Sequence, residues 1–344
     1  MVSEEIRGNK LRDMIIYLTS DCNLSCKHCF LPKIKPKREL TLQDLQWIHD
    51  TFDIKNVNLM GGEPFLYPYL HQAIDMFDRI TLTTNGVFLA SGSSVVDSYI
   101  EQMKKKGDKI SVQLSIEGMQ KTTDEIRGPG VFRKVLDTAQ LLKENDISCY
   151  LRCSYGLMNL KQIPDLIDTI AQPLGVPLVL FPLIGPAPLP ADEQIWLFNL
   201  IMEKNRQYNA KHAIDQPHFI QWLGEHRGRC SAGGARLSVT YNKEIIPCHF
   251  DFDYILGRIG DSLGSINANR EMFLKLKMIQ PSCDFCEHAE VCRSGCYVAN
   301  SHVGCPLKRN FTLERYALMH DIDAGSLGER ISDMKGLLKD SLIC

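Results

Sequence analysis

Three cysteines in one short polar segment are the first residues of this sequence that could carry chemistry. They are Cys22, Cys26 and Cys29, in a CxxxCxxC spacing. Three thiolates on one loop can bind three irons of a 4Fe–4S cube and leave the fourth iron free for a substrate. A zinc site would need a fourth ligand, and His28 is badly placed beside Cys29 to complete that tetrahedron. Three unpaired thiols in a polar loop would also be unusual as core packing.

A second set of cysteines lies towards the C-terminal end, and its spacing is again typical of metal binding. Its densest part has the pattern CxxCx5CxxxC, which paired zinc ribbons could also explain. The set comprises Cys230, Cys248, Cys283, Cys286, Cys292, Cys296 and Cys305. The chain has 13 cysteines in all. An odd number without a secretion signal is better explained by metal ligands than by disulfides.

The composition excludes several classes of protein. A chain of 344 residues suits one large domain and a smaller one. The formal net charge of −2 gives no indication of a nucleic-acid partner or of an anionic membrane surface. No apolar run reaches the roughly 20 residues of a membrane span, and residues 1–10 lack the apolar core of a signal peptide. We therefore expect a cytoplasmic protein with no membrane and no nucleic-acid partner.

Short apolar runs alternate with amphipathic segments through the first two-thirds of the chain, and this order predicts an α/β fold. The expected strands are residues 15–18, 57–60, 80–83, 110–116, 148–154 and 176–181, and the expected helices are residues 41–52, 71–77, 95–106, 131–144, 163–171 and 192–209. Thr41 and Asp44 form a capping-box pattern at the start of the first helix. Six β-α units imply parallel strands joined by right-handed crossovers. Six strands are too few for a closed eight-stranded barrel, so we expect an open, partial (β/α)6 barrel with its ligand site at the C-terminal ends of the strands.

The tetrapeptide Gly61-Gly62-Glu63-Pro64 follows the second expected strand. Two glycines let backbone groups approach a ligand closely, and the carboxylate of Glu63 can accept hydrogen bonds from an ammonium group. Alone, the tetrapeptide could be a turn. Placed at a strand end after the CxxxCxxC loop, it resembles the signature of the radical S-adenosylmethionine (radical SAM) superfamily.

This resemblance implies a 4Fe–4S cluster on the three loop cysteines, with S-adenosylmethionine (SAM) bound beside it. The implied SAM-binding residues are His28 near the adenine, Gly61, Gly62, Glu63 and Pro64 at the amino group of the methionine moiety, Ser115 at the ribose and Arg152 at the carboxylate. Thr84-Asn85-Gly86 also matches relatives, although it is equally a plain turn, and Arg127 is expected to be structural.

The fifth expected strand carries an arginine and two cysteines. Arg152 could pair with the SAM carboxylate through its guanidinium fork, or form a salt bridge with a carboxylate of the barrel. Cys149 and Cys153 share the opposite face of the strand. We expect both thiols to pack inertly under helices rather than to donate a hydrogen atom.

The order of the seven later cysteines resembles the SPASM domain of radical SAM maturases, which holds two auxiliary 4Fe–4S clusters. The resemblance assigns Cys283, Cys286, Cys292 and Cys305 to the distal cluster, and Cys230, Cys248 and Cys296 to the nearer one. The nearer cluster lacks a fourth cysteine, so it either has an open iron or is closed by His249 or Asp251. The expected domains are the barrel at 1–215, the SPASM domain at 216–311 and a helical segment at 312–344. Within the expected SPASM domain, residues 237–241 and 244–247 could form a β-hairpin.

The resemblance implies an oxidoreductase or maturase that cleaves SAM reductively to a 5′-deoxyadenosyl radical and abstracts a substrate hydrogen. Electrons would come from reduced ferredoxin or flavodoxin. The expected substrate is a ribosomally made peptide that receives a thioether or carbon–carbon cross-link. Few residues precede the first strand, so a separate leader-binding protein is expected. The alternative is a dehydrogenase or epimerase for a small molecule such as an aminocyclitol or sugar; a zinc or nucleic-acid module is disfavoured by the near-neutral charge.

Overall fold

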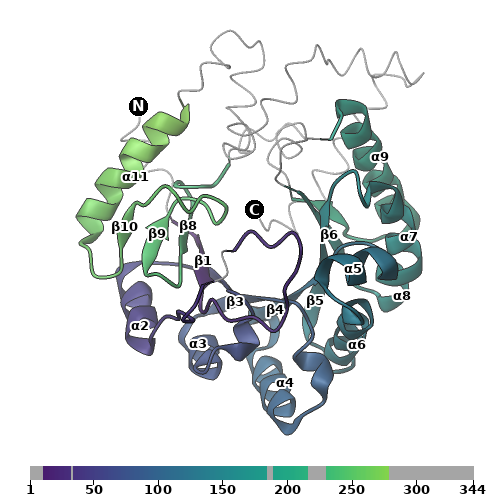
Figure 1. Ribbon diagram of the computed structural model, residues 1–344, viewed down its shortest axis with the longest axis horizontal. Coiled ribbons are helices and arrows are strands. Elements are labelled where there is room, and N and C mark those ends of the chain that lie inside the picture. Colours follow the sequence, from purple (N-terminus) through teal and green to yellow (C-terminus); the bar gives the residue numbers. More distant parts are fainter. Residues whose placement is uncertain (1–10, 32–33, 184–188, 216–229, 279–344) are drawn as a thin grey trace. The chain divides into compact units, whose positions relative to one another are not determined.

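The computed structural model describes residues 11–31, 34–183, 189–215 and 230–278 (Figure 1). These residues fall into two compact units, one made of residues up to Arg152 together with 231–276, and the other starting at Cys153 and including Cys230. The division lies within the strand β5 (Ser148–Tyr155). The remaining predicted cluster ligands, which are Cys283, Cys286, Cys292, Cys296 and Cys305, lie outside the described residues.

The first unit is built on parallel strands joined by helices, as the sequence predicts. Its strands are β1 (Asp13–Tyr17), β2 (Asn56–Met60), β3 (Arg79–Thr84), β4 (Ile110–Ile116) and the start of β5. Each of the pairs β1–β2, β2–β3 and β3–β4 is parallel. The connecting helices are α2 (Leu42–Thr51), α3 (Leu70–Met76), α4 (Ser94–Lys106), α5 (Gln120–Arg127) and α6 (Val131–Glu144). The expected α/β class is therefore confirmed.

The alternation of side chains along these strands separates an apolar face from a polar one. Leu59, Leu82 and Val112 are fully buried, which fits the face that the helices cover in Figure 1. The opposite face carries polar groups: Thr83 Oγ1 donates to Asn58 Oδ1 at 2.8 Å. Similarly, the Tyr150 hydroxyl donates to Gln113 Oε1 at 2.9 Å and joins β5 to β4. A parallel sheet with one polar face is suited to surround a polar ligand.

The sheet of the first unit continues beyond β1 with strands that come much later in the sequence. Strand β8 (Arg236–Val239) pairs in parallel with β1 and antiparallel with β9 (Glu244–Ile246), and β10 (Gly257–Arg258) pairs with β9. The predicted hairpin is therefore confirmed. Its pairing with β1 was not predicted, because the pattern within a strand does not specify which strand lies beside it. The helix α11 (Leu263–Met278) follows.

The helix α2 begins where the sequence predicts, because Thr41 closes the predicted capping box. Thr41 Oγ1 accepts from the Asp44 backbone N–H at 3.2 Å, and the Asp44 carboxylate accepts from the Thr41 N–H at 2.8 Å. No helix in the described ranges is both long and apolar enough to cross a membrane.

The second unit contains strand β6 (Leu178–Pro182), which pairs in parallel with β7 (Ala213–Ile214). Its helices are α7 (Ile163–Leu166), α8 (Gln172–Leu174) and α9 (Ala191–Tyr208), and a π-helical turn at Ile167–Ala171 interrupts the single helix expected there.

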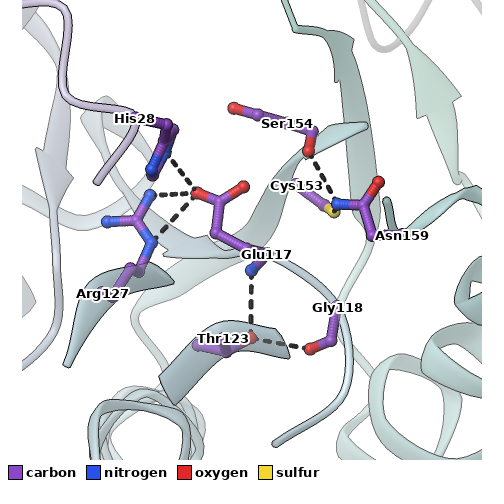
Figure 2. Close-up of polar contacts among 8 residues, drawn as sticks. All are labelled: His28, Glu117, Gly118, Thr123, Arg127, Cys153, Ser154 and Asn159. Carbon is purple, nitrogen blue, oxygen red and sulfur yellow. Dashed lines mark hydrogen bonds and ion pairs between the residues drawn. The ribbon is translucent and has the colours of Figure 1, made fainter. Parts of the chain in front are cut away.

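Both cysteines of β5 are buried, as predicted. Cys149 is 7% exposed and Cys153 is 0% exposed. Burial raises the pKa of the Cys149 thiol to about 11, which keeps it protonated and unreactive near neutral pH. In the second unit, Asn159 Nδ2 donates to Cys153 Sγ at 3.7 Å and to the Ser154 carbonyl at 2.9 Å (Figure 2). These environments support structural roles for the two thiols.

Candidate cofactor-binding site

The CxxxCxxC loop and the GGEP segment leave the same edge of the sheet, because they follow the neighbouring parallel strands β1 and β2. Two backbone hydrogen bonds join the GGEP segment to the residues that lead into the cysteine loop. The N–H of Gly62 donates to the Thr19 carbonyl and that of Glu63 to the Asp21 carbonyl, both at 2.7 Å. The main chain that leads into the predicted cluster-binding loop is thus bonded to the predicted SAM-binding segment.

The two glycines are required by this close approach. A Cβ atom on Gly62 would lie 2.0 Å from the Asp21 carbonyl oxygen, and one on Gly61 would lie 2.5 Å from the Thr19 carbonyl oxygen. Neither distance can be relieved by a side-chain rotation, since both obstructing atoms belong to the backbone. Besides any approach to a ligand, the two glycines allow the segment to pack on the chain that leads into the cysteine loop.

The three loop thiols differ in exposure. Cys22 and Cys26 are half-buried and Cys29 is exposed. Burial raises the pKa of Cys22 to about 11 and also raises that of Cys26, so both are protonated without a metal. Among the described residues, no three Cys, His, Asp or Glu side chains are arranged to hold a single metal ion. Cluster thiolates each bind a separate iron, so these three cysteines need not meet at one point.

Glu63 is completely buried and already accepts three hydrogen bonds. Its Oε1 accepts from Thr84 Oγ1 at 2.6 Å and from the Phe65 N–H at 3.3 Å, and its Oε2 accepts from the Asn85 N–H at 2.9 Å. Burial raises the pKa of Glu63 to about 7, although these hydrogen bonds lower it. Glu63 therefore connects the GGEP segment to the end of β3, in addition to any contact with SAM. Its neighbour Pro64 starts a buried 3-10 turn, Pro64–Leu66.

The predicted role of Glu63 can be separated from this structural one. We expect Glu63→Ala to weaken SAM binding by roughly 1.5–3 kcal/mol, because an ammonium would lose its charged acceptor. The same variant should unfold at a lower temperature, since the Asn85 N–H and the Thr84 hydroxyl lose their acceptor. Tyr67→Phe is the control: it removes a buried hydrogen bond that does not involve this carboxylate, from the Tyr67 hydroxyl to the Leu40 carbonyl at 2.8 Å, and should lower the melting temperature without changing SAM affinity. Calorimetric titration with SAM checks both variants, and unchanged affinity in Glu63→Ala would show that its role is structural only.

His28, within the cysteine loop, is held by a buried carboxylate from the end of β4 (Figure 2). Its Nε2 lies 3.0 Å from Glu117 Oε1, and Arg127 Nε donates to the same oxygen at 3.0 Å. Glu117 is 0% exposed. Although burial raises its pKa, Arg127 and the hydrogen bond from His28 bring the pKa of Glu117 below the usual value, so the carboxylate stays charged. The backbone N–H of Glu117 donates to Thr123 Oγ1 at 3.1 Å, which ties α5 to this point.

Glu117 is a residue of the site that has no recognisable signal in the sequence, and Arg127 has the predicted structural role. An acidic residue directly after an apolar strand is a weak signal, because most such residues are solvated. The cluster of His28, Glu117 and Arg127 fixes the imidazole in one orientation. The second ring nitrogen, His28 Nδ1, is buried and has no hydrogen-bond partner within the described part of the chain.

The residues around the cysteine loop fit an iron–sulfur cluster with SAM beside it. The unpartnered His28 Nδ1 offers a polar contact to a ligand beside the cysteine loop, as the adenine assignment requires. Ser115 is half-buried on β4, on the same polar face as Gln113. Arg152 is half-buried on β5. The donor set and its surroundings therefore fit an iron–sulfur cluster with SAM, although the contacts of Ser115 and Arg152 with SAM stay predictions.

Cys248 and His249 lie in the first unit, beside β1. The Tyr17 hydroxyl donates to the His249 carbonyl at 2.8 Å, and the Phe250 N–H donates to Cys248 Sγ at 3.5 Å. Burial, with the nearby charges of Arg236 and Arg152, places the pKa of His249 well below its usual value. A neutral imidazole of this kind can bind a metal. Asp251 instead accepts from the backbone N–H groups of residues 253 and 254, both at 3.3 Å.

Comparison with protein-family models matches the Radical SAM superfamily over residues 16–170. The sporulation killing factor maturation protein SkfB of Bacillus subtilis is 29% identical over 162 residues, or 45% of this chain and 38% of SkfB. The antilisterial bacteriocin subtilosin biosynthesis protein AlbA, also of B. subtilis, is 25% identical over 312 residues, or 85% of this chain and 66% of AlbA. The matches thus span less than two-thirds of either relative.

Among solved structures, the chain is similar to Streptococcus suis SuiB bound to S-adenosylmethionine. The TM-score is 0.70 at 18% identity, and the match covers 87% of this chain and 76% of SuiB. SuiB has also been solved with its precursor peptide SuiA, and that structure has a TM-score of 0.69 at 17% identity, covering 89% of this chain and 77% of SuiB. At this level of identity, the likeness establishes the fold.

Proposed function

We propose, from the match of residues 16–170 to the Radical SAM superfamily, that the chain is an enzyme that cleaves SAM reductively to modify a ribosomally made peptide. The observation that carries the proposal is the backbone pairing of the GGEP segment with Thr19 and Asp21, which lead into the CxxxCxxC loop, at 2.7 Å in both hydrogen bonds. This pairing brings a three-thiolate loop and a predicted SAM-binding segment to one edge of the sheet.

Each residue of the proposed site has a separate role. Cys22, Cys26 and Cys29 hold the 4Fe–4S cluster, and Gly62 with Glu63 keeps the SAM-binding segment against their loop. His28, oriented by Glu117, would contact the adenine. When bound and reduced by an external donor, the cluster would supply the one electron that splits SAM into methionine and a 5′-deoxyadenosyl radical, the reagent for hydrogen abstraction from the substrate.

The functions given in the names of similar proteins support peptide modification. SkfB is a maturation protein, AlbA acts in the biosynthesis of the bacteriocin subtilosin, and SuiB binds a precursor peptide. The later cysteine spacing further supports a SPASM domain with two auxiliary clusters, on the assignments given above. The domain division at 215 and 311, a cytoplasmic location, a ferredoxin or flavodoxin donor and a separate leader-binding protein belong to the same proposal.

Iron content and SAM cleavage test the proposal. Anaerobically reconstituted protein should hold three clusters, with about four irons for each. Replacing all three loop cysteines with Ala should remove about four irons and leave about eight. The assay measures iron, sulfide and 5′-deoxyadenosine formed with dithionite. Wild-type protein that saturates at about four irons would contradict the two auxiliary clusters, and protein that forms no 5′-deoxyadenosine would contradict the activity.

The substrate class needs a separate measurement. A short peptide encoded beside this gene should accelerate 5′-deoxyadenosine formation. Mass spectrometry should then show that the peptide has lost hydrogen, because forming a cross-link removes hydrogen atoms. A scrambled peptide of the same composition is the control. If only a small molecule such as an aminocyclitol is converted, the chain is a dehydrogenase or epimerase and the peptide proposal is wrong.

A further inference from the structure

A turn at the end of β3 lies against the cysteine loop, and its central residue touches a predicted cluster ligand. Asn85 Nδ2 donates to Cys22 Sγ at 3.8 Å and to Asn23 Oδ1 at 2.8 Å. The two hydrogens of one amide thus serve two acceptors. Asn85 is 7% exposed, so this donor is shielded from water.

The orientation of this amide is determined by its other end. Asn85 Oδ1 accepts from the Val87 N–H at 2.9 Å, which directs the NH2 group, and not the oxygen, at Cys22. The backbone N–H of Asn85 is held by Glu63 Oε2 at 2.9 Å. The turn is further fixed by Thr138, whose hydroxyl donates to the Gly86 carbonyl at 2.7 Å. Rotating this amide away from the sulfur would break the hydrogen bonds of its oxygen with the Val87 N–H and of its nitrogen with Asn23.

Cys22 differs from the other two loop cysteines in this respect. Its sulfur also accepts from the Leu24 N–H at 3.4 Å, so two N–H groups point at it. Among the described residues, no side-chain N–H donates a hydrogen bond to Cys26 or Cys29, and Cys29 Sγ itself donates to the Leu31 carbonyl at 3.9 Å. Hydrogen bonds to cluster sulfurs are one of the principal determinants of reduction potential, because they stabilise the extra negative charge of the reduced state.

We propose that Asn85 raises the reduction potential of the cluster bound by Cys22, through its N–H···S hydrogen bond to that cysteine. The inference rests on the proposed function, since it requires the cluster. It gives the Thr84-Asn85-Gly86 turn a role in electron uptake as well as in the shape of the loop. Glu63 becomes a positioning residue for this donor, because it holds the Asn85 backbone.

The test is a redox titration of the full reconstituted chain, followed by electron paramagnetic resonance. Samples are frozen with and without SAM, and the signal that changes with SAM identifies the cluster of the cysteine loop. Asn85→Leu keeps the approximate shape and removes the donor, so its potential should become more negative. At a fixed solution potential, we expect the ratio of reduced to oxidised cluster to fall about tenfold, which is about 59 mV for a one-electron couple. Asn23→Ala is the matched control, because it removes the other acceptor of the same amide and should leave the potential unchanged.

A second measurement does not depend on folding of the Leu variant. In Asn23→Ala protein labelled with 15N-asparagine, pulsed resonance should detect a 15N coupling to the SAM-sensitive signal. An Asn85→Leu protein with wild-type potential, or labelled protein without that coupling, would overturn the proposal and leave Asn85 a structural residue. A wild-type protein with no SAM-sensitive signal would instead remove the proposed function, and this inference with it.

Discussion

Cys26→Ala should abolish 5′-deoxyadenosine formation, with or without a peptide substrate. Cys26 is the central thiol of a loop that supplies three ligands, and two ligands are too few to hold a cube that also keeps one iron open. Cys26 is half-buried. Its pKa is raised by burial, so the thiol becomes a thiolate only when the metal displaces its proton. We therefore expect the loss of about four irons and of all SAM cleavage, measured by iron assay and by chromatography of the nucleoside products.

The matched control for this variant is Cys149→Ala. Cys149 lies in the same compact unit and is 7% exposed, but its predicted role is packing. This control should keep its iron and its SAM cleavage, with only a modest fall in melting temperature. Circular dichroism of both variants reports whether the fold survives. A folded Cys26→Ala protein that still forms 5′-deoxyadenosine would overturn the whole assignment of the site.

The elements that the sequence predicts best are those with strong apolar periodicity. Strand β4 (Ile110–Ile116) and helix α6 (Val131–Glu144) have the predicted bounds. Helix α5 was not predicted, because it is polar and buries only Thr123. It is placed by tertiary contacts, notably by its last residue Arg127 on Glu117. Such a helix has no signal in its own sequence.

The features of the site can likewise be separated into those that the sequence predicts and those that it does not. The ligand types and their position at strand ends follow from spacing, because parallel strands bring their C-terminal loops to one edge. Spacing does not reveal that Gly62 packs on the backbone of Asp21, or that Asn85 turns its amide towards Cys22. Those contacts join segments that are distant in the chain, and each depends on the register between neighbouring strands. Glu117 was missed for the same reason, since its partner His28 belongs to another loop.

The contact at Gly62 leads to the second large effect, which we expect for Gly62→Ala. The new methyl carbon would lie 2.0 Å from the Asp21 carbonyl oxygen, and that oxygen accepts the hydrogen bond from the Glu63 N–H at 2.7 Å. Ordinary overpacking costs ~1–3 kcal/mol when side chains can shift. Here the obstacle is backbone, so the GGEP segment must separate from the cysteine loop. We expect loss of SAM binding and of about four irons, while the auxiliary clusters keep theirs.

Gly264→Ala is the matched control for the same chemical change. Gly264 lies in α11, where an added Cβ would meet only Ser262 Oγ at 4.0 Å. Because alanine is favoured over glycine within a helix by about 1 kcal/mol, this control should keep iron content and SAM affinity and should not be less stable. If the Gly62→Ala protein keeps its full iron content and wild-type SAM affinity, the backbone contact between the two segments is not needed to bind the cluster or SAM. We expect both to be lost in Gly62→Ala, because the added methyl group cannot fit unless the backbone contact between the two segments is broken.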